Sequence, residues 1–570
     1  MTMQHRILLR RLFLLPALKP KNPTPTRLLI RQSQLNSRSR PQLPFLSTPL
    51  AKNHQFRYLT TERKRWLVYE VYLAFKYTVY FWAIVGFSVI AYWSVQQEWL
   101  ERKYPTPHEW GFLTRLRFRV AKWGPDRTDW VGVETDWVVI GEYAKNVIER
   151  LEDRKIEGAG VEDLMEGGIW IDGIGNSGYD ITAKSEPWQR GYYEALMLAA
   201  KAAEQLDDHV LDTTRRIVFP ASTVIGPSNP NPKPIPAGAE TAPREENCER
   251  AFEEPEMFYM RILTTRGFSS KQKMDAALAY ASWLDFKEVP EAAIRMYDWA
   301  LSLASENTPP TEMPYDKGSY VLRDNAPTPS KNILDALTAL ATHKARNGDI
   351  SSALPILLSI LRARRSLPET QPKFSSTSYT QPEPPSNSPW TASNILSTIK
   401  RLVAPPAYPP PPPSGDSPPI RDAQERCEEA GLNLYIGEII YASRAREDGV
   451  AWTREAVDLA EEQLHKLGPS PHSSGAKKTC RECLSSGLEN WAKMAARLAR
   501  EEREKEAAPS ASSGSTWFGL WGDSKQKREE ETIGRWAAEE NVVKERTRRA
   551  QDVLDELEAP STPFSSIFSV

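Results

Sequence analysis

The residues best suited to chemistry in this sequence are two cysteines in a C-x-x-C pattern, Cys480 and Cys483. With His465 and His472 upstream they could supply four zinc ligands, because thiolates and imidazoles are the donors of tetrahedral zinc sites. The spacing is unusual, and an intervening Gly-Pro loop would have to fold over the metal. Two other interpretations are open, a disulfide between the pair or two thiols packed on one helix face. We favour packed thiols, because a disulfide within a helix is geometrically awkward.

A second candidate is a literal G-x-G-x-x-G at residues 173–178. In a dinucleotide-binding fold these glycines admit a pyrophosphate to the N-terminus of a helix that follows a strand. Here the preceding apolar run covers only residues 169–171, and residues 179–187 are turn-like, so we favour a glycine-rich loop. The sequence suggests no Ser/His/Asp or Cys/His set and contains neither a Walker A motif nor H-E-x-x-H. We therefore expect no catalytic residue, no cofactor and no metal.

The balance of charge differs between the two parts of the chain. The 570 residues carry a net charge of −1, but residues 1–61 hold eleven Lys and Arg and no Asp or Glu. The remainder therefore holds 62 basic and 74 acidic residues and shows no basic stripe. This balance argues against nucleic acid as a partner. Four cysteines are too few for a disulfide-dense secreted scaffold.

Residues 1–61 have the composition of a mitochondrial transit peptide, since they are rich in Arg, contain Ser and lack acids. A secretory signal is the competing interpretation, but the apolar run at 12–18 is short and is broken by Pro16. Arg57, which precedes small polar residues, is a candidate processing point. A disordered basic tail is the third alternative.

Residues 66–97 are predicted to form a single transmembrane helix. The nineteen residues 77–95 contain no charge and would span roughly 28 Å as a helix, close to the thickness of a bilayer. Aromatic residues flank both ends, as in an interfacial belt. Basic residues precede the span, so the positive-inside rule places the N-terminus in the matrix and the C-terminal part in the intermembrane space. The alternative is a buried core helix.

The remaining chain is predicted to be all-α, an irregular α-solenoid of tetratricopeptide-like helix pairs with long insertions. After a juxtamembrane spacer at 98–130, repeats are expected over 131–365 and again over 421–506. Small residues at fixed positions let neighbouring helices approach closely, and stacking buries the apolar faces. The positions that match this packing pattern are Trp137, Gly141, Ala281, Ala293, Tyr297, Ala300, Ala341, Ala353 and Gly437.

Two low-complexity segments interrupt this pattern. Residues 366–420 are rich in Pro and Ser and are expected to be disordered or in polyproline II conformation, with an SH3-type ligand as the functional alternative. Residues 507–523 form a second linker and contain the aromatic stretch WFGLW at 517–521. These aromatic side chains could pack back onto the helices or serve as a docking peptide. A charged helix is predicted over 524–558.

The order of leader, aromatic-rich span, YPTPHEW spacer and degenerate repeats resembles the fungal adaptor subunit of the inner-membrane i-AAA protease supercomplex. Residues 254–301 and 477–498 are also similar to that family. The resemblance implies a non-catalytic, membrane-embedded subunit that binds unfolded proteins. Its expected partners are an ATP-dependent zinc protease and the protease's other adaptor subunit. The alternative is a scaffold or assembly factor for a respiratory or import complex.

Overall fold

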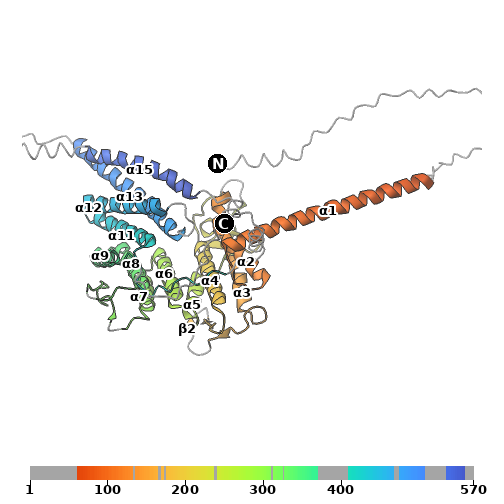
Figure 1. The fold of residues 1–570 in the computed structure, drawn as a ribbon, viewed down its shortest axis with the longest axis horizontal. Helices are drawn as coiled ribbons and strands as arrows, with labels where there is room; N and C mark the ends of the chain where they lie inside the picture. Colours follow the sequence, from red (N-terminus) through yellow and green to blue (C-terminus); the bar gives the residue numbers. More distant parts are fainter. Residues whose placement is uncertain are drawn as a thin grey trace, which may run out of the picture. The chain divides into compact units, whose positions relative to one another are not determined.

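The computed structural model describes a mostly helical protein, which confirms the predicted helical class (Figure 1). The described residues contain thirteen α-helices and seven short strands. They are residues 61–131, 135–164, 169–171, 175–235, 240–309, 312–324, 326–369, 408–443, 445–467, 474–507 and 534–558. The predicted leader, apart from Thr61, and the predicted linker with its WFGLW stretch, apart from Ala507, lie outside these ranges.

Helix α1 (Thr61–Lys103) is long and apolar enough to cross a membrane. Its 43 residues extend beyond the predicted span of 66–97 at both ends. The large apolar side chains between Trp66 and Val95 are almost all exposed, as expected of a helix that faces lipid rather than a protein core. The chain divides into two compact units, residues 1–87 and 88–570, so the last turns of α1 belong to the second unit.

The predicted spacer at 98–130 is largely helical instead. Helix α2 (Phe112–Val131) occupies much of it, because Phe118 and Ala121 give this segment a buried face. Helix α2 packs on α3 (Trp137–Glu152), which packs in turn on α4 (Glu186–Leu206).

Three small antiparallel sheets interrupt the early helices. Between α3 and α4, β1 (Glu162–Asp163) pairs with β4 (Tyr179–Asp180), and β2 (Ile169–Ile171) pairs with β3 (Gly175–Ser177). The glycine-rich stretch therefore contributes a strand, while residues 172–174 lie outside the described ranges. After α4, the central strand β5 (His209–Asp212) pairs with β6 (Ile217–Pro220) and with β7 (Cys248–Arg250).

The later helices pack one after another along the chain. From α6 to α15, each described helix contacts the next described helix in sequence order (Figure 1). Side chains cap the starts of α6, α8, α9 and α11, and the cap of α6 is a capping box between Ser269 and Gln272. The helices are α5 (Pro255–Thr264), α6 (Ser270–Phe286), α7 (Pro290–Ala304), α8 (Lys331–Arg346), α9 (Ile350–Arg365), α11 (Ala423–Ala442), α12 (Arg446–Leu467), α13 (Ser474–Ala507) and α15 (Arg535–Glu558).

The end of the Pro-rich segment, which was expected to be disordered or in polyproline II conformation over 366–420, packs against the helices. Residues 408–416, here called the strap, cross the first turns of α4, α6 and α8. Arg190 donates to the carbonyl oxygens of Pro409 at 2.6 Å and of Pro410 at 2.8 Å. Lys271 contacts the Pro413 carbonyl at 3.4 Å, and the Asn332 amide donates to the Ser414 carbonyl at 2.9 Å. The strap thus links helices that are distant in sequence.

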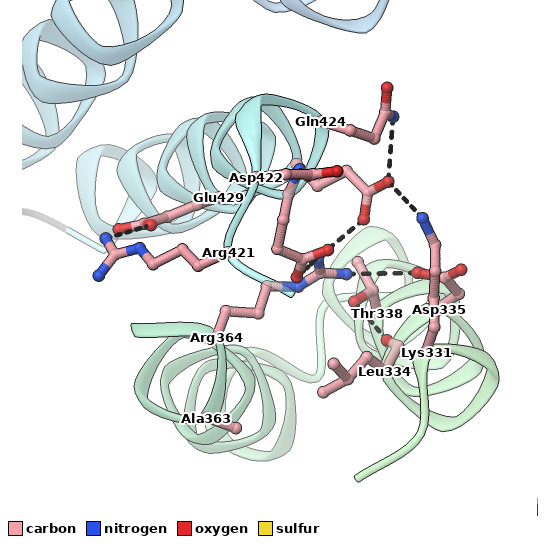
Figure 2. Close-up of polar contacts among 12 residues, drawn as sticks. Lys331, Leu334, Asp335, Thr338, Ala363, Arg364, Arg421, Asp422, Gln424 and Glu429 are labelled. Atoms are coloured by element: carbon pink, nitrogen blue, oxygen red, sulfur yellow. Dashed lines mark hydrogen bonds and ion pairs between the residues drawn. The ribbon is translucent and has the colours of Figure 1, made fainter. Parts of the chain in front are cut away.

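A buried ionic cluster joins α8, α9 and α11 (Figure 2). Figure 2 shows Arg364 pointing from α9 toward Asp335 of α8 and the start of α11. The Arg364 guanidinium lies 3.2 Å from Asp335 and 2.7 Å from Glu428, and it pairs with Glu425. The ammonium of Lys331 also contacts Glu428, at 2.9 Å. These contacts hold together the helices on either side of residues 370–407.

Candidate peptide-binding groove

Most of the predicted repeat-packing positions lie in helix–helix contacts. At Gly141, an added Cβ would lie 3.0 Å from the Phe252 ring, so this position requires a small residue. Trp137 is half-buried beneath Lys201, whose ammonium lies 5.7 Å from the ring centre. The remaining positions are buried, namely Ala281, Ala293, Tyr297, Ala300, Ala341, Ala353 and Gly437.

Tyr297 belongs to a buried polar cluster that connects α6, α7 and α8. Its hydroxyl donates to Asp285 Oδ2 at 3.0 Å, and the other carboxylate oxygen lies 2.7 Å from His343 Nδ1. The Tyr297 and His343 rings lie 4.9 Å apart. Burial and the neighbouring carboxylate raise the pKa of Tyr297. Because these side chains are buried, they are inaccessible to a substrate, and their contacts stabilise the packing of the three helices.

Packed thiols were the favoured prediction for Cys480 and Cys483, and only Cys483 is a free thiol. Cys480 forms a disulfide with Cys427 of α11, with the two Cα atoms 4.9 Å apart, and not with Cys483. Position 483 lies on the same helix one turn later, whereas Cys427 faces Cys480 from a neighbouring helix. The thiol of Cys483 is half-buried, with its sulfur 3.4 Å from the Cys427 carbonyl oxygen, and burial raises its pKa to about 11. Since Cys480 is oxidised, it is unavailable as a zinc thiolate. Residue 472 lies outside the described ranges.

A groove of about 830 Å³ opens between α4 and α6. Its apolar part consists mainly of aromatic, thioether and aliphatic side chains on the two helices, and Phe286 at the end of α6 is 75 % exposed. These side chains are Tyr193, Met197, Leu198, Trp283 and Phe286. The groove is therefore an open, largely apolar channel with walls of large, adaptable side chains.

Some of the polar groups around the groove pair with one another, whereas the buried Nδ1 of His209 has no hydrogen-bond partner. Lys122 of α2 pairs with Glu194, and the Tyr259 hydroxyl donates to Glu204 at 2.7 Å. Burial raises the pKa of Glu204 above the usual range for a carboxyl group. The groove presents more apolar than polar surface, which suits the side chains of an unfolded or extended polypeptide.

Sequence reasoning missed these groove residues. The only local signal is the spacing of Tyr193 and Met197, four residues apart on one face of α4. The same spacing on a helix usually marks a core position, and the sequence does not show that α6 leaves this face open.

The geometry thus defines a class of protein: it is mostly helical, has one apolar helix of membrane-spanning length, and has an open apolar groove within residues 88–570. In comparisons with known proteins, no protein-family model and no curated protein matches the chain. The functional argument therefore depends on this groove, on α1 and on the chemistry of the sequence.

Proposed function

We propose that this chain is a non-catalytic adaptor of the mitochondrial inner-membrane i-AAA protease that recruits unfolded or misfolded proteins. In this proposal α1 anchors the protein in the inner membrane. The basic, acid-free leader enters the matrix, and the residues after α1 lie in the intermembrane space. The Lys and Arg residues before the apolar run support this orientation, because positive residues flank the side of a span that stays inside.

We further propose that the helices form a tetratricopeptide-like solenoid. The support comes from the hairpins α6–α7, α8–α9 and α11–α12, each of which packs on its neighbour. Small residues at the crossings, such as Ala281 and Ala341, are fully buried. Helical repeats of this kind present extended surfaces for peptides and proteins rather than active sites.

The groove between α4 and α6 is the single observation that carries the adaptor proposal. Unfolded proteins expose apolar side chains, and Met and aromatic side chains accommodate many such sequences because they repack easily. The groove combines Met197 with Trp283 and Phe286 in one channel. Because the sequence contains no Walker A or H-E-x-x-H motif, ATP hydrolysis and peptide cleavage are assigned to the partner.

The test is to capture the tagged full chain from gently solubilised mitochondria and to identify the bound proteins by mass spectrometry. The proposal expects an i-AAA protease and its other adaptor subunit, together with slower degradation of the protease's substrates when this chain is deleted. Recovery of a respiratory or import complex with unchanged protein turnover would instead support the assembly-factor alternative.

A further inference from the structure

Two adjacent apolar side chains at the start of α2 face outward from the protein. Phe112 is 57 % exposed and Leu113 is 51 % exposed, in a helix whose next turn buries Phe118 completely. Single exposed apolar residues are common, but adjacent large ones at the beginning of a helix mark a surface with a partner.

The partner is indicated by the neighbour of Phe112. Its ring lies 6.2 Å from the ring of Trp93, edge to face, and Trp93 lies in the last turn of the apolar stretch 77–95. After Trp93, α1 continues for ten residues to Lys103, which corresponds to about 15 Å along the helix axis. The chain must then return by a similar distance to bring Phe112 beside Trp93. The first turn of α2 therefore lies level with the end of the apolar stretch.

Buried contacts hold this return in place. The carboxylate of Glu101, 4 % exposed, accepts hydrogen bonds from the backbone N–H of Thr106 at 3.1 Å and from its hydroxyl at 2.8 Å. It also pairs with Arg115 at 3.0 Å and with Arg119, both from α2. The first turn of α2 is thus fixed against the last turns of α1 by a buried ion cluster.

We propose that Phe112 and Leu113 insert into the lipid of the bilayer at the boundary between headgroups and acyl chains. This inference rests on the proposed membrane location of α1. Aromatic and aliphatic side chains favour this boundary, and Trp93 is the type of residue that lies there at the end of a span. The lipid would cover the two side chains that the protein leaves open, and it would hold the beginning of the soluble part at the membrane surface.

Spin labelling of the full chain in lipid nanodiscs tests the inference. The two free cysteines are first replaced, in the C248S/C483S background, so that the Cys427–Cys480 disulfide remains. Single labels are then introduced as Leu113→Cys, as Ile84→Cys within the apolar stretch, and as Val542→Cys on α15. Positions 84 and 542 are also exposed apolar residues, so each of the three labels replaces an exposed aliphatic side chain. Power saturation compares collisions with oxygen, which concentrates in lipid, and with a water-soluble nickel chelate.

The inference expects the ratio of oxygen to nickel collisions at 113 to exceed one, as at 84, and the ratio at 542 to fall below one. A ratio at 113 equal to that at 542, with 84 in lipid, would overturn the inference and leave the span intact. Water access at both 84 and 113 would overturn the span itself, and the inference with it. Because position 113 is exposed, the label need not disturb the fold, which the circular dichroism of each variant verifies.

Discussion

Arg190 Nη1 donates to the carbonyl oxygen of Pro410 at 2.8 Å, although 220 residues separate them in sequence. The same guanidinium donates to Pro409 and lies 4.4 Å from the centre of the Tyr408 ring. A planar cation thus recognises two backbone carbonyls and an aromatic face together, a geometry that lysine cannot reproduce. This site holds the strap on α4.

Arg190→Gln is therefore expected to release the strap. Hydrogen bonds from a charged donor contribute about 1.5–3 kcal/mol, so the amides of Ser414, Gly415 and Asp416, which follow the prolines of the strap, should exchange with deuterium at least tenfold faster. Hydrogen exchange with mass spectrometry measures this rate. Lys271→Gln is the matched control, because its single contact with the strap is 3.4 Å long and exposed. Equal exchange rates in both variants would show that Arg190 does not hold the strap.

The ionic cluster around Arg364 should make stability depend on pH. Three carboxylates, Asp335, Glu425 and Glu428, surround two cations, Arg364 and Lys331. Burial raises the pKa of Glu425 to about 7 and that of Asp335 to about 6. Since these values exceed those of the unfolded chain, the folded state binds more protons between about pH 4 and pH 7. The free energy of unfolding should therefore fall by about 4 kcal/mol as the pH rises from 5 to 8.

Glu425→Gln tests this pH dependence, because the amide keeps the shape of the side chain and cannot ionise. The variant should lose less stability than the natural protein between pH 5 and pH 8, as measured by the midpoint of thermal unfolding in detergent. Glu455→Gln is the control, since Glu455 pairs with Arg365 at the exposed edge of the cluster. The assignment is wrong if the Glu425→Gln variant retains the natural slope.

Phe286→Ser should weaken binding of an unfolded polypeptide to the groove. Loss of one exposed aromatic contact is expected to raise the Kd about tenfold, the equivalent of about 1.4 kcal/mol. Fluorescence anisotropy with a labelled, permanently unfolded protein measures this Kd. Val542→Ser removes a similarly exposed apolar side chain from α15 and should leave the Kd unchanged. A parallel loss in both variants would indicate non-specific hydrophobic binding instead of a groove.

The Cys427–Cys480 disulfide should stabilise the folded protein, because it closes a loop and so lowers the conformational entropy of the unfolded chain. The two residues are 53 positions apart, and the chain-entropy model gives about 4 kcal/mol for a loop of this length. Cys427→Ser should therefore lower the unfolding midpoint markedly, and dithiothreitol should lower the midpoint of the natural protein but not of the variant. Cys483→Ser is the control, because this thiol is free. An unchanged midpoint after reduction would refute the contribution.

Gly437→Ala tests whether α11 requires a small residue at its crossing with α12. An added Cβ would lie 2.8 Å from Thr453 Oγ1 and 3.0 Å from the Gly449 carbonyl oxygen. Overpacking of this kind costs about 1–3 kcal/mol, which thermal unfolding detects. At Gly475 the nearest atom would be 3.7 Å away, so Gly475→Ala should stabilise the helix slightly. Two variants of equal stability would mean that the helices adjust without cost.

The sequence by itself determined the helical class and the apolar stretch of α1, and it contains local capping signals. These features depend on local properties, namely hydropathy, periodicity and capping, and a cap such as Ser269 with Gln272 needs only four neighbouring residues. The local pattern also predicted that Gly141 and Ala300 lie at contacts between helices, but it did not indicate which side chains they contact. The predicted spacer was too long: residues 104–111, which contain the prolines at 105 and 107, are not helical, whereas the residues after them bury Phe118 and form α2.

Only the tertiary structure decided which distant residues meet. It paired Cys480 with Cys427, placed the carbonyls of the strap on Arg190, and brought Glu425 to Arg364. It also left one face of α4 uncovered between Met197 and Phe286, where the groove lies. Contacts across 50 to 220 residues depend on how the helices stack, and that stacking minimises exposed apolar area over the whole molecule rather than within any local window.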